Sequence, residues 1–349
     1  MKRKLISVLM VLALVVSVSV PFSFISVSAS PMPENWDFER YGDVIDIGTT
    51  MRLAESDDAY ISGLDSMIIE QAKELGISLQ GDPKDNSETS ESTSEGSAFT
   101  YDGGTKYFLG YRNGSYYLKQ YTLRSVGENV EVWVAKDLAF QDDRPLPVVT
   151  QEQVDKVRDE FDGNIYVNDT AFFGTPDSHT GNNALLPGMV GLPEDYYTPA
   201  DGQERSIILV DNIRDENYYD PTYPFFIAGF YSSSYERYFD RNVISIDTNN
   251  WETRLENTFL PTVAHELQHL IHDDNDSDEE TWVNEGMADF AEYLCGFGQP
   301  WGHINFFLDH PENSLVSWDE YYNAETGPET LADYGQAYLL TYYMNEKYG

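Results

Sequence analysis

The chain has 349 residues, of which 60 are acidic and 21 basic, giving a formal net charge of -39 at pH 7. This length is sufficient for one large domain or two small ones, each with its own core. A surface so negative repels nucleic acid and anionic membranes, so we expect neither as a partner.

The first 29 residues have the features of an export signal. Three basic residues at positions 2–4 precede an apolar run over residues 5–20, and Val27-Ser28-Ala29 offers small side chains for cleavage after Ala29. We therefore predict a signal peptide over 1–29 and a secreted, extracellular protein, with an uncleaved membrane anchor at this segment as the alternative. No later segment has the ~18 apolar residues that cross a bilayer.

Residues 30–98 contain no recognisable chemistry. Helical spacing of apolar residues over 66–79 predicts a helix, and residues 30–80 are interpreted as an N-terminal arm or a pro-segment. Residues 81–98 are rich in Ser and acidic residues, and such a segment cannot bury enough apolar surface to offset its ordering entropy. We predict a disordered linker here, followed by one folded domain over 99–349.

Residues 99–250 combine strand and helix patterns. Two tyrosine-rich runs flank an Asn113-Gly114 turn, which is typical of a hairpin. Further strands are predicted over 128–134, 206–210 and 243–246, and a helix over 151–161. In the first of these strands, three valines at alternate positions, from Val130 to Val134, indicate one buried face. The fold class is therefore α+β.

The remaining residues, 251–349, are predicted to be helical, with helices near 260–272, 282–295 and 330–348. The first contains H-E-L-Q-H at residues 265–269, which matches the H-E-x-x-H zinc motif. At about 100° per residue, His265 and His269 lie about 40° apart, on the face opposite the apolar stripe. Two imidazoles facing a cleft are zinc ligands, and Glu266 between them is placed to act as general base.

The second of these helices completes the predicted metal site. Glu285 and Asp289 lie one turn apart, opposite an apolar stripe. Glu285 is the predicted third zinc ligand. Asp289 is predicted to accept a hydrogen bond from the distal nitrogen of a ligand histidine, most plausibly His265.

The motif H-E-L-Q-H at 265–269 followed by N-E-G-M-A-D at 284–289 resembles the gluzincins, the thermolysin-like clan of zinc peptidases. Segments 229–232 (G-F-Y-S) and 333–338 (D-Y-G-Q-A-Y) are similar to the hyicolysin-type family of secreted bacterial peptidases. The resemblance implies a two-lobed zincin domain, with a strand-rich lobe over 99–250 and a helical lobe over 251–349 whose active-site helix lines the cleft. It also implies that the strand near 243–246 pairs with extended substrate.

By the same resemblance, Tyr334 is the candidate for stabilising the oxyanion of the tetrahedral intermediate, and His303 and His310 are the alternatives. His272 lies about 10.5 Å along the helix from His265 and is expected to be a cap or surface residue. Cys295 is the only cysteine, so no disulfide can form within the chain, and it is expected to be a buried structural thiol.

Calcium is the second cofactor that the acidic composition raises. The segment 273–280 lacks the glycine of an EF-hand loop, since Glu279 stands at the sixth position after a start at Asp274, and a solvated loop is favoured. Asp211, Asp215 and Asp220 are the alternative calcium cluster.

The sequence as a whole predicts a secreted zinc endopeptidase that acts on protein or peptide substrates. Zinc would activate water, and Glu266 would take its proton and deliver it to the leaving amine. Two alternatives stay open: a surface or adhesion protein with an inactive zincin domain, and a zinc hydrolase that does not act on peptides. No oligomeric state is predicted.

Overall fold

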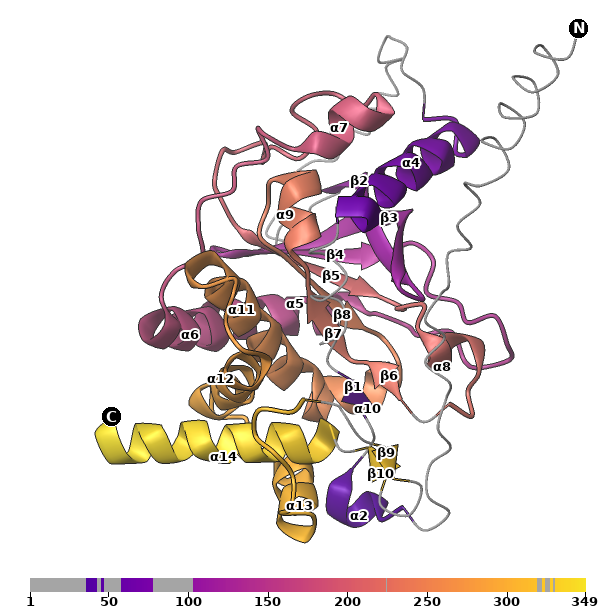
Figure 1. Cartoon of the computed structure of the whole chain (residues 1–349). Helices are drawn as coiled ribbons and strands as arrows, with labels where there is room; N and C mark the ends of the chain where they lie inside the picture. The colour runs from indigo at the N-terminus through magenta and orange to yellow at the C-terminus, as the bar shows by residue number, and fades with distance from the viewer. Residues whose placement is uncertain are drawn as a thin grey trace, which may run out of the picture. The chain divides into compact units, whose positions relative to one another are not determined.

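The computed structural model describes residues 36–42, 45–46, 58–77, 103–223, 225–318, 322–323, 327–328 and 330–349. The predicted signal peptide and the predicted linker lie outside the described residues. The described part is α+β, as the sequence predicted, with one six-stranded mixed sheet and helices on both of its faces (Figure 1). Within these ranges, none of the helices has the length and hydropathy that crossing a membrane requires.

The central sheet has the strand order β2-β3-β4-β5-β8-β7. Its β4–β5 and β5–β8 pairs are parallel, and the other neighbours are antiparallel. The strands, in the order of the sheet, are β2 (Gly103–Arg112), β3 (Ser115–Val126), β4 (Val130–Ala135), β5 (Ser206–Asp211), β8 (Val243–Asp247) and β7 (Gly229–Tyr231).

The hairpin predicted around Asn113 and Gly114 is confirmed. Both residues have positive φ, 40° and 77°, as a tight turn between twisted antiparallel strands requires. The strand predicted over 128–134 is confirmed as β4, and its three valines are buried; the opposite face is buried too, since all six residues are buried. The parallel partner β5 is buried along its whole length too, which is typical of strands covered by helices on both faces.

The strand at 243–246, expected from the resemblance to pair with substrate, has no open edge. β8 pairs with β5 over its whole length on one side and with β7 at Ile244–Ile246 on the other. That expectation is therefore wrong for β8. The strand at this edge of the sheet is β7, which packs on helix α11.

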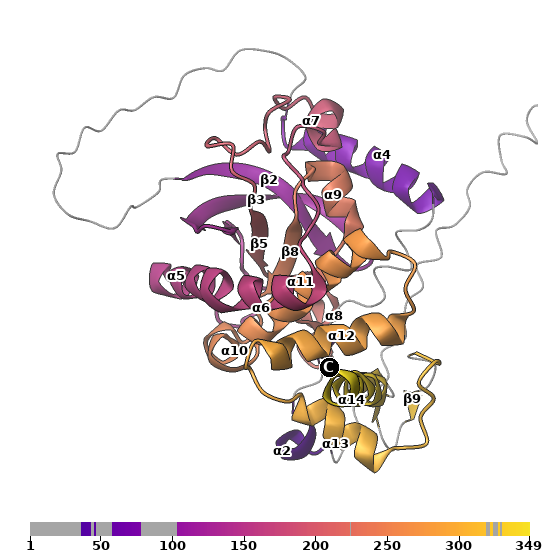
Figure 2. The same ribbon diagram turned by 90° about the vertical axis from the view of Figure 1, so that its left-hand side faces the viewer.

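Helices cover both faces of the sheet (Figures 1 and 2). The helix predicted over 66–79 overlaps α4, which starts earlier and ends at Glu74; its side chains at Leu64, Ile68 and Ala72 belong to the main core. On that face lie α4 (Asp58–Glu74), α7 (Leu185–Val190) and α9 (Ser233–Phe239). On the other lie α5 (Gln151–Glu160), the π-helical turn η1 (Phe161–Ile165), α6 (Tyr166–Phe173) and α11 (Phe259–Asn275).

Beyond α11 the helices stack in layers away from the sheet (Figure 2). Helix α12 packs between α11 and α14, and α14 packs on α13. The three predicted C-terminal helices are confirmed as α11, α12 (Thr281–Leu294) and α14 (Thr330–Tyr348). The sequence analysis did not predict α13 (Trp301–Asp309) or the preceding α10 (Trp251–Asn257).

Short elements complete the described part. Helix α2 (Phe38–Tyr41) packs on α13, where Arg40 forms an ion pair with Asp309. The remaining elements are β1 (Ile45–Asp46), which pairs in parallel with β6 (Phe226–Ile227), β9 (Tyr322–Asn323), which pairs with β10 (Gly327–Pro328), and α8 (Glu216–Tyr219).

Close contact between α12 and α14 depends on Gly286. A Cβ atom at this position would lie 2.8 Å from the backbone oxygen of Ala337, so Gly286→Ala must push the two helices apart. We expect a loss of about 1–3 kcal/mol in the free energy of unfolding, measured by denaturant titration. Gly188→Ala in α7 is the matched control, because nothing lies within 4 Å of its Cβ. A Gly286→Ala variant as stable as the control would contradict the close packing.

Candidate metal centre

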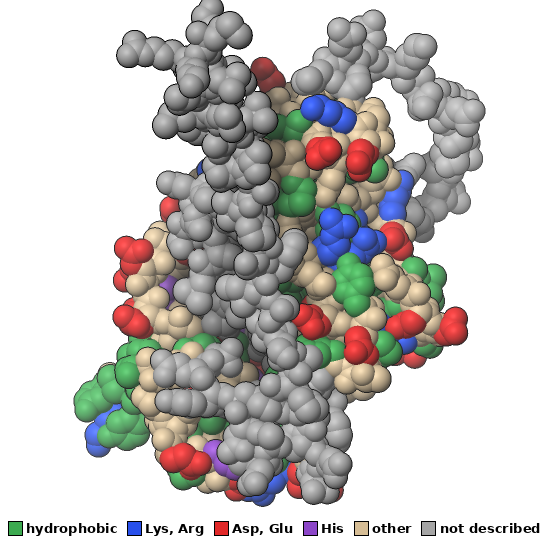
Figure 3. Space-filling view, turned by 45° about the vertical axis from the view of Figure 1, so that its right-hand side comes forward, with side chains coloured by type: hydrophobic (Ala, Val, Ile, Leu, Met, Phe, Trp, Pro, Cys, Tyr) green, Lys and Arg blue, Asp and Glu red, His purple; other side chains and the backbone are tan. Residues whose placement is uncertain are grey.

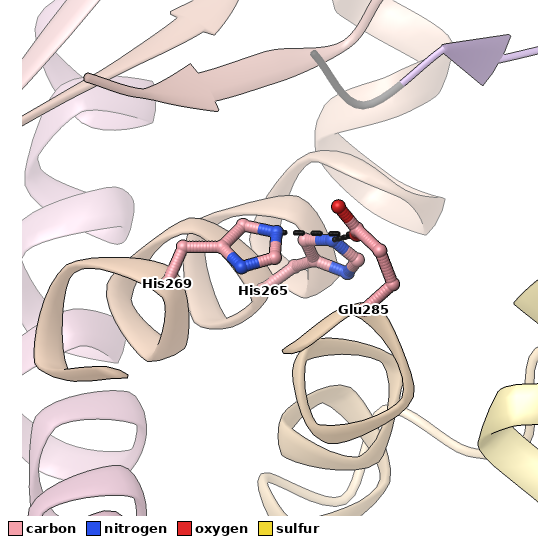
Figure 4. Close-up of side chains that lie close together, drawn as sticks. All are labelled: His265, His269 and Glu285. Carbon is pink, nitrogen blue, oxygen red and sulfur yellow. Dashed lines mark hydrogen bonds and ion pairs between the residues drawn. The ribbon is translucent and has the colours of Figure 1, made fainter. Parts of the chain in front are cut away.

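Helices α11 and α12 bring the three predicted zinc ligands together (Figure 4). The Nε2 atom of His265 lies 3.2 Å from Oε2 of Glu285, and Nε2 of His269 lies 3.3 Å from the same oxygen. The two imidazole rings are 4.7 Å apart between centroids and nearly perpendicular. Two nitrogens and one carboxylate oxygen therefore converge on one point. The residues that carry them span 20 positions of the sequence, from His265 to Glu285.

These donor atoms fit a zinc ion in both chemistry and spacing. Two histidines and one glutamate form a known ligand set of catalytic zinc. Ligand atoms at about 2.0–2.1 Å from a tetrahedral ion lie about 3.3 Å from each other. The observed nitrogen–oxygen separations of 3.2 and 3.3 Å match that spacing. The three residues could thus hold zinc with little movement of their side chains.

The sequence analysis predicted that the two histidines face away from the core into a cleft. This is wrong, because both side chains are buried. His265 and Glu285 are fully buried, and His269 is 3 % exposed. The reason is tertiary, since α12 packs against the histidine face of α11. The site is therefore enclosed by protein, which strengthens electrostatic interactions within it.

The distal nitrogens of both histidines face hydrogen-bond acceptors on α12. Nδ1 of His269 lies 2.7 Å from the amide oxygen of Asn284. Nδ1 of His265 lies 3.3 Å from Oδ1 of Asp289, as predicted, and 3.3 Å from Oε1 of Glu292. Acceptors at Nδ1 favour a proton there, so that Nε2 presents a lone pair toward the metal position.

Asn284 and Glu292 were missed by the sequence analysis. Glu292 lies seven positions after Glu285, on the face of α12 that Glu285 and Asp289 share, whereas Asn284 lies about 100° around the helix from Glu285. That periodicity could have identified Glu292. Nothing in the sequence distinguishes Asn284 from an ordinary helix residue, because its role depends on where α11 crosses α12.

His303 on α13 holds Asp289 from the other side. Its Nδ1 lies 3.0 Å from Oδ2 of Asp289, and its ring stacks on Tyr334 at 4.9 Å. Burial raises the pKa of Asp289, but the positive charge of His303 and the hydrogen bond from His265 outweigh it and hold that pKa below its usual value. Asp289 is therefore an ionised acceptor for His265.

The same network makes His265 a strong base. Burial lowers the pKa of His265, but hydrogen bonds to Asp289, Glu285 and Glu292 outweigh that cost and raise the pKa well above its usual value. A metal ion must displace the proton at Nε2, so metal affinity should decrease as pH falls.

Glu266 and Tyr334 border the three metal ligands. Glu266 is fully buried on α11, and its negative charge contributes to the raised pKa of His265. The ring of Tyr334 on α14 lies 6.3 Å from the ring of His265, and Trp318 packs edge-on against it. Both residues therefore lie near His265, one of the three converging side chains.

The residues that the sequence analysis had set aside lie elsewhere. His272 contacts Gln268, and His310 packs on Phe306; neither belongs to a metal-competent group among the described residues. Cys295 is buried, and its thiol donates a hydrogen bond to Asp169 at 3.4 Å. Burial raises its pKa above the usual value, as expected for a structural thiol.

The tentative calcium cluster of Asp211, Asp215 and Asp220 does not form a metal-competent group within the described ranges. Asp211 forms an ion pair with Lys119, and Asp215 accepts hydrogen bonds from the backbone of Tyr218 and Ile227. Asp220 accepts from Thr222 two residues on, as in a turn. Asp274, the other calcium candidate, lies in the last turn of α11 rather than in a loop.

The hydrogen bond between His269 and Asn284 is directly testable. In Asn284→Ala, His269 keeps its place on α11 but loses the acceptor that orients its ring. We expect zinc affinity at this centre to fall by about 10–100-fold, measured by competition with a chromogenic chelator. Asn257→Ala on α10 is the matched control, since Asn257 is exposed and donates a hydrogen bond to Thr253 within its own helix. Equal zinc affinities of the two variants would contradict an orienting role.

No protein-family model matches this chain, and no curated protein matches it either. The assignment of a function therefore depends on the residues themselves.

Proposed function

We propose that the protein is a secreted, zinc-dependent endopeptidase of the zincin type. The observation that carries the proposal is the convergence of His265 Nε2 and His269 Nε2 on one oxygen of Glu285, with Glu266 buried beside them. Secretion is proposed from the N-terminal export pattern over residues 1–29.

A zincin-type division into two lobes is part of the proposal. The sheet and its helices would form the strand-rich lobe, and α12, α13 and α14 the helical lobe, with α11 between them. The edge strand β7 would then align an extended substrate. Gly229 at its start lies against Thr262, one turn before Glu266 on α11, so a peptide paired with β7 would run close to the metal position.

Zinc held by His265, His269 and Glu285 would polarise the scissile carbonyl and lower the pKa of the attacking water. Glu266 would take the proton of that water and deliver it to the nitrogen of the leaving amine. Tyr334 would donate a hydrogen bond to the oxygen that becomes negative as the carbonyl is attacked. Asn284 and Asp289 would hold the two imidazoles in the tautomer that ligates.

Acidic and basic side chains are both present on the face drawn in Figure 3, where the acidic ones are scattered rather than gathered in one patch. The substrate class that we propose is proteins and peptides in extended conformation, recognised through their backbone along the edge strand β7.

Casein digestion by the secreted chain tests the proposal. We expect cleavage at internal peptide bonds, loss of cleavage after treatment with a zinc chelator, and recovery when zinc is restored. Bound zinc without cleavage of casein or of a mixed peptide library would favour the inactive zincin domain or the non-peptidase hydrolase. Cleavage that continues after zinc removal would contradict the proposal.

A further inference from the structure

A second group of donor atoms lies at the end of α11, away from the proposed zinc centre. It consists of His179 in the segment after α6, Glu236 on α9 and Asp274 in the last turn of α11, all half-buried, with one donor atom of each within 4.8 Å of the others. We propose that these three side chains form a second metal site that binds a divalent cation of the zinc class. Asp274 follows His269 by five residues, about 7.5 Å along the helix, so the two sites are distinct.

The orientation of His179 is that of a metal ligand. Its Nδ1 lies 3.2 Å from Oδ1 of Asp240, and its Nε2 lies 3.6 Å from Oε2 of Glu236. A carboxylate at Nδ1 places the proton there and turns the lone pair of Nε2 toward Glu236. His265 has the same arrangement, with Asp289 at Nδ1 and Glu285 at Nε2.

Each of the two carboxylates is held through one of its oxygens. The hydroxyl of Tyr231 donates to Oε1 of Glu236 at 2.9 Å, and the backbone nitrogen of Asp177 donates to Oδ2 of Asp274 at 2.7 Å. It is the other oxygen of Glu236, Oε2, that faces His179. The donor atoms are thus fixed by α9, α11, the neighbouring strand β7 and the segment after α6 together.

The local charge favours a cation. Asp240 lies beside His179, and Asp273 adjoins Glu236, so this region holds four carboxylates and one imidazole. The pKa of Glu236 is raised to about 7, mainly by burial and next by repulsion from Asp274. Burial also raises the pKa of Asp274. A divalent cation relieves this repulsion, and it also complements the partial negative charge at the C-terminal end of α11.

The donor set selects the class of cation. Imidazole nitrogen with two carboxylate oxygens suits zinc and its neighbours in the first transition row, whereas calcium prefers six to eight oxygens. Because the three side chains are only half-buried, water can occupy the remaining coordination positions of the cation. The cation would fasten α9 and the segment after α6 to the helix that carries His265 and His269.

Zinc stoichiometry separates the two sites. The full chain carrying Glu266→Gln, which prevents self-digestion, is loaded with zinc, dialysed and measured by atomic emission. We expect two equivalents. One should remain after His179→Ala and one after His269→Ala, and none in the double variant. Glu204→Gln is the matched control, because Glu204 contacts the neighbouring Ser178 but is not part of the group, and it should keep both.

Two further variants keep the test decisive if His179→Ala does not fold. Asp274→Asn should also lose one zinc, and Asp240→Asn, which alters only the group that orients His179, should weaken zinc at this site by about 10–100-fold. A single equivalent in the parent chain, lost with His269→Ala, would overturn the proposal. So would calcium binding in preference to zinc, or a second zinc that survives both His179→Ala and Asp274→Asn. In the first case, the contacts of His179 with Asp240 and Glu236 alone would explain the cluster.

Discussion

Replacing Glu266 by glutamine should reduce kcat/KM for casein or a peptide substrate by at least about 10²–10⁴-fold, the usual contribution of a general base. Glutamine keeps the shape of the side chain but cannot take the proton of the attacking water. Because Glu266 is not among the three converging donors, the variant should hold as much zinc as the wild type. Steady-state kinetics and zinc content, measured on the same preparation, test both parts.

The matched control for this variant is Glu256→Gln on α10. Glu256 is exposed and forms an ion pair with Lys156, so its loss should leave activity and zinc content unchanged. Full activity of Glu266→Gln would remove Glu266 from the mechanism. Loss of zinc from Glu266→Gln would instead mean that Glu266 helps to hold the metal.

Replacing His269 by alanine should abolish peptidase activity and remove one zinc equivalent relative to the wild type. The reason is that only Glu285 and His265 would remain to hold the metal, and catalytic zinc sites use three protein ligands. Zinc analysis after dialysis and a casein digest measure the two effects. The fold should persist, because the core residues of α11, such as Val263, Leu267 and Leu270, are untouched.

His272→Ala provides the matched control on the same helix. His272 lies three residues beyond His269, and its Nδ1 lies 3.1 Å from Nε2 of Gln268. It should therefore retain the full zinc content and activity. If His269→Ala and His272→Ala behaved alike, the assignment of His269 as a ligand would be wrong.

The elements that sequence predicted well are those with a strong local pattern. The Asn113-Gly114 hairpin follows from the φ angles that such a turn needs, and α11, α12 and α14 follow from helical periodicity. Helix α13 was missed. It is only nine residues long, and Phe306 and Ile304 are buried in separate small clusters. A short helix of this kind is formed by its contacts with α14 and α2 more than by its own pattern.

That His265, His269 and Glu285 belong together could be predicted from sequence because much of their geometry is local. One turn of helix fixes His265 beside His269, and one turn places Glu285 in line with Asp289. The local sequence does not determine that α12 lies against the face of α11 that carries the two histidines. The burial of the site, the contact of Asn284 with His269 and the contact of His303 with Asp289 all follow from that packing.

The sequence by itself determined which side chains share a helix face, and hence the chemistry of the proposed zinc centre. Only the tertiary structure decided which segments meet at that centre. It also decided that β8 is paired on both edges while β7 is the edge strand. Finally, it brought His179, Glu236 and Asp274 together, although 95 residues separate the first from the last. The physical reason is that helix and strand periods are properties of neighbouring residues. The order of strands and the packing of helices depend instead on burying apolar surface contributed by distant parts of the chain.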